Sequence, residues 1–364
     1  MHAPEGIDDL TRDLVSIPSH DDETAAGDAI ERWLREATDA DVTRDETGNV
    51  IARRGMGETS LALVGHHDVV PPAESQVRGD AGEYVVEERD GRLYGRGTAD
   101  MKGAVAAAMC AFRDATVDCE LLFVSFVGEE QGGVGARAAI DDGFVPDYAV
   151  VGEGSTGYSA AGVTDVAVAH KGRRGSTIVA HGEGAHASEP ASGKNAVYRA
   201  CDAVDVVRSI EFPESEVLGR EVGGSIAVTE IDGGTAWNVI PDRCEVTVDE
   251  RTVPGERAPL DSVEEIEGVE WRVDQDLPPM ACDDAAFADL VLDAAREAQD
   301  EAPEHVVKPH ATDAGWLADA GTTCVVCGAA EPGEAHTADE SVSLAVLDRC
   351  YRIYRGVAES MGAR

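Results

Sequence analysis

Histidine and carboxylate residues recur in this sequence at the ends of short apolar runs. The first pair, His66 and Asp68, follows the apolar run 61–64. In an extended segment residues i and i+2 point to the same side, so these two side chains can converge on one point. A histidine that binds a metal through one ring nitrogen is often held at the other by a carboxylate. The pair indicates a metal site, although such pairs also occur on ordinary surfaces.

Two further apolar runs, and two segments that precede helices, supply carboxylates or a histidine. Asp100 precedes an alanine-rich helix, where the cap of the helix is an alternative role. Glu129 and Glu130 follow an apolar run, and adjacent carboxylates repel unless a cation or a proton relieves them. Glu153 ends the next run in a glycine turn, and His336 precedes the last helix. One shared carboxylate with a histidine and a carboxylate for each ion would make a two-metal site.

Alternating strands and helices position these candidates. We expect strands at 61–65, 120–127 and 148–152, and helices at 22–38, 102–113 and 136–141. This alternation predicts an α/β fold with a mostly parallel central sheet that is covered on both faces. Ligands of such sheets bind at the carboxyl ends of the strands, which is where the candidates lie.

The pattern changes near residue 172. From there to about 279 it predicts strands at 176–180, 225–231 and 243–249 and a helix at 195–210. We interpret this segment as an α+β unit with a four-stranded antiparallel sheet. Helices at 283–299 and 341–359 return to the α/β pattern. The prediction is a catalytic metal-binding domain formed by 1–171 and 280–364, with a second domain inserted at 172–279.

Acidic residues dominate the composition. There are 71 Asp and Glu against 30 Lys and Arg, which gives a formal net charge of −41 spread along the chain. Salt screens such repulsion, because the Debye length falls to about 3 Å at 1 M. We therefore expect a cytoplasmic protein of a halophile. A basic stripe for nucleic acid is lacking, and no apolar run is long enough to span a bilayer.

The eight cysteines show no disulfide framework. Cys324 and Cys327 have the two-residue spacing of a zinc site, but they fall in an apolar run that predicts a buried strand, 322–327. Packing is the favoured interpretation for this pair.

The combined motifs resemble the two-zinc aminoacylase and exopeptidase family that includes acetylornithine deacetylase, succinyl-diaminopimelate desuccinylase and carboxypeptidase G. The matching segments occur in the family's order and are spread over nearly the whole chain: GHHDVVP, YGRGTADMKG, FVGEEQGGVGA, VGEG, GEGAHASEPASGKNAV, GGTAWNVIPDRCEVTVDERTVPG and AHTADE. The resemblance implies a phosphorylase/hydrolase-like catalytic domain. It also implies a ferredoxin-like inserted domain that serves as lid and dimerisation domain.

The resemblance also implies a set of metal ligands. His66, Asp100 and Glu153 would hold one divalent ion, and Glu130, His336 and the bridging Asp100 the other. The peptide bond after the bridging aspartate is expected to be cis. Zn²⁺ is the expected metal, and Co²⁺ or Mn²⁺ also fits a site with one histidine per ion and carboxylate oxygens.

The remaining site residues are carried over in the same way. Glu129 would be the general base, taking a proton from a metal-bridging water, and Asp68 would orient its neighbouring histidine. His186 would reach the active site of a partner subunit and stabilise the oxyanion. The implied substrate contacts are Asn238, Arg251 and Thr312.

The expected activity is removal of an N-acyl group from an amino acid, with substrates of the acetylornithine or succinyl-diaminopimelate type. An exopeptidase or dipeptidase acting on a short peptide is the alternative within the class. A catalytically silent metal-binding homologue is a further alternative, against which stand Glu129, Asp68 and the complete ligand set. The resemblance implies a homodimer.

Overall fold

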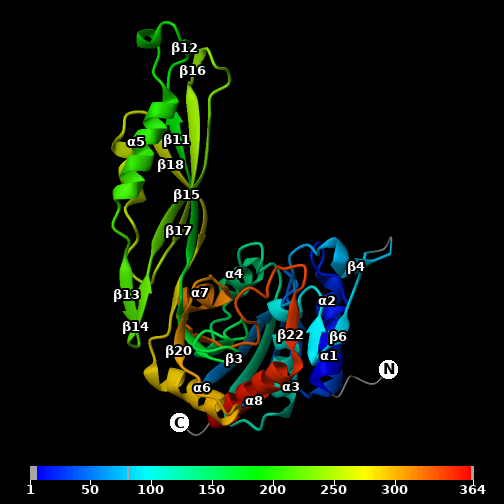
Figure 1. Cartoon of the computed structure of the whole chain (residues 1–364). Helices are drawn as coiled ribbons and strands as arrows, with labels where there is room; N and C mark the ends of the chain where they lie inside the picture. Colours follow the sequence, from blue (N-terminus) through cyan, green and yellow to red (C-terminus); the bar gives the residue numbers. More distant parts are fainter. Residues whose placement is uncertain (1–5, 80–81, 362–364) are drawn as a thin grey trace. The chain divides into compact units, whose positions relative to one another are not determined.

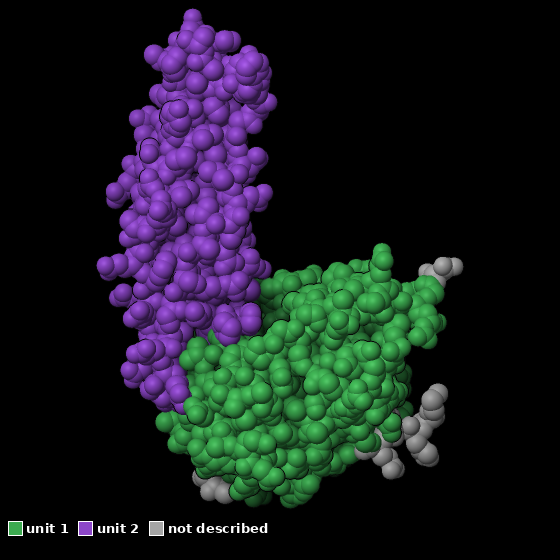
Figure 2. All heavy atoms as spheres, viewed as in Figure 1, with its two compact units in different colours: residues 1–169, 280–308, 312–364 green, residues 170–279, 309–311 purple. Residues whose placement is uncertain are grey.

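The computed structural model describes residues 6–79 and 82–361 of the chain. These residues form two compact units, coloured separately in Figure 2. The first unit consists of the described residues within 1–169, 280–308 and 312–364, and the second of 170–279 and 309–311.

A nine-stranded sheet forms the centre of the first unit. Eight strands follow the order β1-β2-β8-β3-β9-β21-β10-β19, and β20 pairs with β10. Their bounds are β1 Asp41–Arg44, β2 Val50–Arg54, β3 Ser60–His66, β8 Glu120–Phe126, β9 Tyr148–Val151, β10 Val166–His170, β19 Met280–Ala281, β20 His305–Lys308 and β21 Thr323–Val326. The central strands β8, β3, β9 and β21 are parallel. The predicted mostly parallel α/β sheet is confirmed.

Helices cover both faces of this sheet. Their bounds are α1 Ile7–Val15, α2 Thr24–Ala37, α3 Gly103–Asp114, α4 Val134–Asp141, α6 Ala285–Glu297, α7 Asp313–Asp319 and α8 Leu344–Met361. The alanine-rich α3 packs on β3 and β8 and is itself covered by α8 and α1 (Figure 1). On the other face, small residues of α4 and α7 such as Ala136 and Ala314 pack against Val64, Val124 and Val326 in the strands. Small side chains allow these helices to lie close to the sheet.

Small sheets and turns complete the first unit. Strands β22 Ser341–Ser343, β7 Arg92–Tyr94 and β6 Glu87–Arg89 form one sheet, β4 Val77–Arg78 and β5 Glu83–Tyr84 form another, and Thr98–Lys102 and Glu74–Gln76 are helical turns. The prediction of a helix from residue 341 was wrong at its start, because Ser341–Ser343 pairs with β7 and the helix begins at Leu344. The alternation Ser-Val-Ser with a buried centre suits a strand.

The second unit is an α+β unit, as predicted. Its sheet is antiparallel in the order β15 Ser225–Gly233, β17 Arg243–Arg251, β11 Arg173–His181 and β18 Val269–Leu277. Helix α5 Ala196–Ser209 covers one face, where alternate residues such as Val246 and Val248 are buried. A hairpin, a second two-stranded sheet and two turns complete it. The hairpin pairs β13 Glu214–Val217 with β14 Arg220–Gly223, the sheet pairs β12 Ala185–His186 with β16 Val239–Ile240, and the turns are Pro190–Ser192 and Leu260–Glu265.

Candidate metal centre

The predicted ligands gather at one edge of the parallel sheet. His66 is the last residue of β3, Glu129 and Glu130 follow β8, and Glu153 follows β9. Strands β8, β3 and β9 are adjacent and parallel, so their carboxyl ends meet at the same edge. The apolar runs that end in a polar residue therefore deliver that residue to one place.

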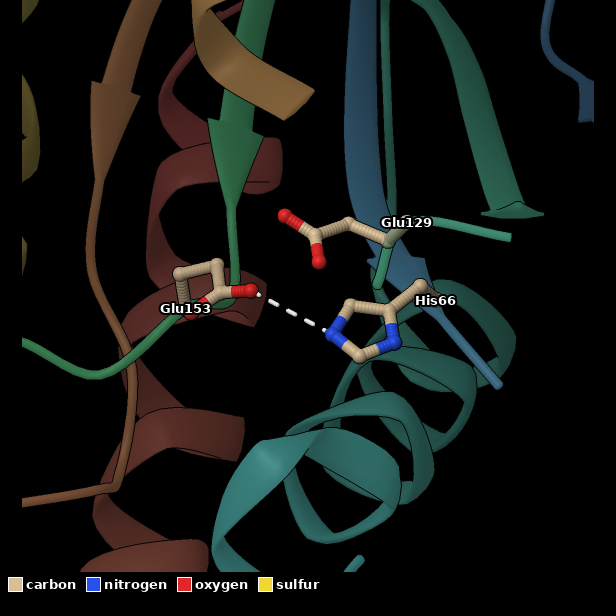
Figure 3. Close-up of side chains that lie close together, drawn as sticks. All are labelled: His66, Glu129 and Glu153. Atoms are coloured by element: carbon tan, nitrogen blue, oxygen red, sulfur yellow. Dashed lines mark ion pairs between the residues drawn. The ribbon is translucent and has the colours of Figure 1, made fainter. Parts of the chain in front are cut away.

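The first ligand group consists of His66, Glu129 and Glu153. One ligand atom from each lies within 4.8 Å of the other two. Figure 3 shows the imidazole and both carboxylates directed toward one another, and His66 Nε2 is 3.3 Å from Glu153 Oε1. Sequence reasoning placed Glu129 outside the ligand set, whereas the geometry puts its carboxylate within reach of the same point.

The second ligand group consists of Asp100, Glu130 and His336, again with ligand atoms within 4.8 Å of one another. His336 Nε2 is 2.9 Å from Glu130 Oε1 and 3.1 Å from Asp100 Oδ2. His336 has a φ of 63°, a left-handed conformation that non-glycine residues rarely adopt.

Asp100 joins the two groups. Its Oδ1 is 3.0 Å from His66 Nε2, and its Oδ2 is 3.1 Å from His336 Nε2. The two oxygens of one carboxylate therefore face the two histidines. The Asp100–Met101 peptide bond is cis, as expected.

Asp68 holds both His66 and the segment that carries the two glutamates. Its Oδ1 lies 3.3 Å from His66 Nδ1, and its two oxygens accept the backbone N–H groups of Glu129 and Glu130 at 3.1 and 3.0 Å. Burial by itself would raise the pKa of Asp68, but the hydrogen bonds from His66 and from these N–H groups lower it. The carboxylate is thus engaged on the side of His66 away from the ligand groups.

Glu340 supports Asp100, and sequence reasoning did not single it out. This buried carboxylate accepts the backbone N–H groups of Gly97, Ala99 and Asp100 at 2.9, 3.0 and 3.2 Å. It also forms an ion pair with Arg96 Nη1 at 2.5 Å. Glu340 lies four residues after His336, so one segment contributes a ligand and fixes the turn of another. In so acidic a chain nothing marked this glutamate except its place in the AHTADE segment.

Lys308 is a second residue that sequence reasoning missed. Its side chain is buried, and Nζ lies 3.3 Å from Glu153 Oε2 and 2.9 Å from the Gly154 carbonyl oxygen. Burial by itself would lower the pKa of Lys308, but the charges of Glu153, Tyr158 and Asp100 raise it. The ammonium group therefore stays charged beside a predicted ligand.

Asp313, at the start of α7, adds another acidic group. It is buried, and its Oδ1 has no hydrogen-bond partner among the described residues. Burial, together with the negative charges of Asp68 and Glu153, raises the pKa of Asp313 to about 8. The sequence analysis noted the adjacent Thr312 and passed over this residue.

The shifted pKa values in the two ligand groups indicate excess negative charge that bound cations would neutralise. Burial raises the pKa of Glu129 well above its ordinary value, as do the charges of Asp313 and Glu153. Hydrogen bonds with Asp100 and Glu130 raise the pKa of His336 to about 10. Buried carboxylates this close together are costly unless cations or protons compensate them. Imidazole nitrogen and carboxylate oxygen are ligands of Zn²⁺, Co²⁺ and Mn²⁺, so the residues present fit two divalent ions.

Two predicted functional residues of the second unit lie on or beside its two-stranded β12–β16 sheet. His186 is exposed, and its Nδ1 lies 2.6 Å from the Ser188 hydroxyl. Asn238 is exposed, and its backbone carbonyl accepts the Ala187 N–H at 2.9 Å. Neither belongs to the two ligand groups, and their roles stay predictions.

The other two predicted substrate contacts already have partners. Arg251 Nε donates to Asp249 Oδ1 at 2.8 Å on the second unit's sheet. Thr312 is the N-cap of α7, where its hydroxyl accepts the Ala314 N–H at 3.2 Å. A substrate would have to compete with these contacts, so both roles stay predictions.

The cysteine pair belongs to the core. Cys324 and Cys327 are buried at β21 and its end, and all eight cysteines are free thiols. The candidate ligand groups found among the described residues contain no cysteine. Packing accounts for this pair.

Two ligand groups that share one carboxylate and lie at the carboxyl edge of the sheet are typical of a metal-dependent hydrolase. The family comparison makes the class specific, because residues 62–360 match the model of peptidase family M20/M25/M40. The chain belongs to this family, whose enzymes act on amide bonds. No helix among the described residues is long and apolar enough to cross a membrane.

Two relatives match almost the whole chain. The chain is 32% identical to the succinyl-diaminopimelate desuccinylase of Afipia carboxidovorans, covering 96% of this chain and 97% of the relative. It is 30% identical to the acetylornithine deacetylase of Myxococcus xanthus, covering 93% and 90%.

Solved structures support the fold. The aminopeptidase PepT of Bacillus cereus matches with a TM-score of 0.80 at 19% identity, covering 98% of both chains. A dinuclear metal-binding peptidase of the M20 family from Bacillus subtilis matches with a TM-score of 0.73 at 17% identity, covering 98% of this chain and 97% of that one.

Proposed function

We propose that this protein is a two-metal amidohydrolase that removes an N-acyl group from an amino acid. The observation that carries the proposal is Asp100, whose two oxygens face His66 and His336 at 3.0 and 3.1 Å. A carboxylate between two ligand groups, each with a histidine and a further glutamate, is what a pair of ions acting together requires. His66, Asp100 and Glu153 would hold one ion, and Asp100, Glu130 and His336 the other.

Glu129 is the proposed general base. Two ions, when bound, would lower the pKa of a water molecule and polarise the carbonyl of the scissile amide. Glu129 takes a proton from the attacking water and returns it to the nitrogen of the leaving amine, so that the acyl group departs as a carboxylate and the amino acid as a free amine. Asp68 keeps His66 in the tautomer that presents Nε2, because Nδ1 faces both the backbone carbonyl oxygen of Asp68 at 3.1 Å and its carboxylate at 3.3 Å.

The proposed substrates are N-acyl amino acids of the acetylornithine and succinyl-diaminopimelate type. Support comes from the two relatives at 32% and 30% identity, which bear the corresponding names and match over nearly their whole length. The alternative is a peptidase, which the structural neighbours favour at 19% and 17% identity. Sequence identity is higher for the deacylases, so we place the deacylase first.

A substrate panel tests the proposal. The purified protein is loaded with Zn²⁺, Co²⁺ or Mn²⁺, and kcat/KM is measured for N-acetylornithine, N-succinyl-diaminopimelate and simple dipeptides. We expect one of the two N-acyl amino acids to exceed every dipeptide by at least about tenfold. A dipeptide as the best substrate would overturn the deacylase assignment, and hydrolysis of none of the panel by the metal-loaded protein would favour the silent homologue.

We also propose that the protein works as a homodimer through its second unit, with His186 of one copy acting on the oxyanion in the other. Support comes from β15, an edge strand of that unit's sheet, and from Trp237, which is 98% exposed. A native mass measurement by light scattering checks the assembly. A monomer with full activity would contradict the cross-subunit role of His186.

We further propose zinc as the native metal and a cytoplasmic protein that works at high salt. The net charge of −41 supports the salt dependence, since carboxylate repulsion weakens as ionic strength rises. Unfolding measured from 0.1 to 3 M KCl should show increasing stability, and no dependence on salt would contradict the halophilic assignment.

A further inference from the structure

Lysine is scarce in this chain, and half of its lysines are buried in the first unit. Lysine occurs only at 102, 171, 194 and 308, and of these Lys102 and Lys308 are buried. Lys102 donates to the backbone carbonyls of Leu14 and Ile17, so its contacts are structural. Lys308 instead contacts a predicted metal ligand.

The two oxygens of Glu153 face different partners. Oε1 lies 3.3 Å from His66 Nε2, within the first ligand group, whereas Oε2 lies 3.3 Å from Lys308 Nζ. The ammonium also donates a hydrogen bond to the Gly154 carbonyl oxygen at 2.9 Å. Both side chains are buried, with 8% of the lysine and 10% of the glutamate side chain exposed, so water screens this interaction weakly.

We propose that Lys308 is a positioning residue that restricts Glu153 to one metal-binding oxygen and weakens the hold of the His66–Glu153 group on its ion. A free carboxylate can bind an ion through both oxygens. With one oxygen taken by an ammonium, it offers the other, and the lysine charge opposes the approach of a cation. An ion held by this group would keep more of its positive charge, because Glu153 would give it only one oxygen. It would also have a coordination position free for substrate, as catalytic sites require.

The proposal rests on the metal-dependent function proposed above, and ion binding tests it separately from activity. Zinc affinity is measured by competition with a chromophoric chelator for wild type and for Lys308→Met. We expect the methionine variant to bind the ion of the first group about tenfold more tightly, while kcat falls about tenfold and KM changes little. The same comparison on a His336→Ala background reports the first group alone.

Two matched variants separate charge from packing. Lys308→Arg keeps the charge and should retain both the affinity and kcat of wild type within about threefold. Lys194→Met removes an exposed lysine that is paired with Glu183 and should change neither. Where Lys308→Met does not fold, Lys308→Gln serves the same purpose, since it keeps a donor for the Gly154 carbonyl and loses the charge.

The direction of the affinity change decides the outcome. A residue that merely supports Glu153 would, when removed, let the ligand move and weaken ion binding. Weaker or unchanged binding in Lys308→Met therefore overturns the inference. A wild-type protein that binds no pair of ions would instead overturn the proposed function itself.

Discussion

The two ligand groups use the same kinds of donor in different surroundings. The side chain of His66 is 1% exposed, whereas that of His336 is 50% exposed. His66 and Glu153 end neighbouring strands of the parallel sheet, while His336 lies on a loop that follows the last central strand, β21. One group is thus fixed by the sheet, and the other depends on contacts made by a loop.

Each group has its own supporting carboxylate. Asp68 joins His66 to the backbone of Glu129 and Glu130, so the sheet-borne group is supported by the strand ends themselves. Glu340 fixes the turn of Asp100 from the segment that also carries His336. A loop can therefore contribute a ligand reliably when the same segment also anchors the ligand's partner.

The largest expected effect distinguishes the roles of the adjacent residues Glu129 and Glu130. Glu129→Gln should lower kcat by about a thousandfold, the scale of general-base catalysis, and should still bind two ions. Glu130→Gln should lose affinity for the ion of the His336 group. Steady-state kinetics with metal analysis by mass spectrometry measures both. If the Glu129→Gln protein bound a single ion, Glu129 would be a ligand of the buried His66 group, and that group would have one more carboxylate ligand than the His336 group.

Glu340→Gln should have the next largest effect. It leaves Arg96 buried without a charged partner and weakens three backbone hydrogen bonds. Breaking a buried ion pair costs about 3 kcal/mol, which denaturant unfolding of the metal-free protein measures. The double variant Arg96→Met/Glu340→Gln should recover part of the loss. Unchanged stability would show that the loop-borne group does not depend on this anchor.

A smaller effect is expected at Asp68. Replacing the partner that orients a metal-bound histidine typically costs about ten- to a hundredfold in affinity or activity. Asp68→Asn should therefore lose about that factor in kcat and keep both ions, whereas His66→Ala should lose an ion outright. Equal metal loss in the two variants would mean that Asp68 is itself a ligand.

The smallest effect concerns protons. In the metal-free protein the pKa of His336 is raised to about 10 by Asp100 and Glu130, against about 6.5 for an unfolded histidine. Its stabilising contribution is complete below about pH 6.5 and is lost as the pH rises through about 10. An ion must displace this proton, so affinity should rise with pH. Calorimetry in buffers of different ionisation enthalpy measures the protons released on ion binding. At pH 7 the His336→Ala variant should release about one proton fewer than wild type, and equal release would contradict the pairing of His336 with Asp100 and Glu130.

Much of this architecture follows from local patterns. Apolar runs that end in His66, Glu129 and Glu153 are strands because continuous burial on both faces suits a parallel sheet. The alanine-rich stretch before Arg113 forms α3 because alanine has the highest helix propensity, and its small side chain allows close packing on the sheet. The motifs carried the family assignment. The start of the last helix was misjudged because Ser341–Ser343 obtains its backbone partners from a distant strand.

The supporting residues could not be found in this way. Glu340 and Asp313 are two among 71 Asp and Glu, so nothing in the sequence distinguishes them. Lys308 is one of only four lysines, but its sequence neighbours do not show that it lies beside Glu153. Their importance comes from partners 100 or more residues away, as between Glu340 and Asp100 or between Lys308 and Glu153, with separations of 240 and 155 residues.

Which residues can bind metal, and that strand ends bring several of them together, follows from the amino-acid sequence, since strand direction and side-chain alternation are local properties. How the carboxylate oxygens are shared follows from the folded structure. The two oxygens of Asp100 face the two histidines, and those of Glu153 face His66 and Lys308. Those of Asp68 accept backbone N–H groups, while Oδ1 also lies beside His66 Nδ1. Which partner each carboxylate oxygen contacts depends on separations of about 3 Å. Folding sets these separations, because most of the partners are distant in the sequence.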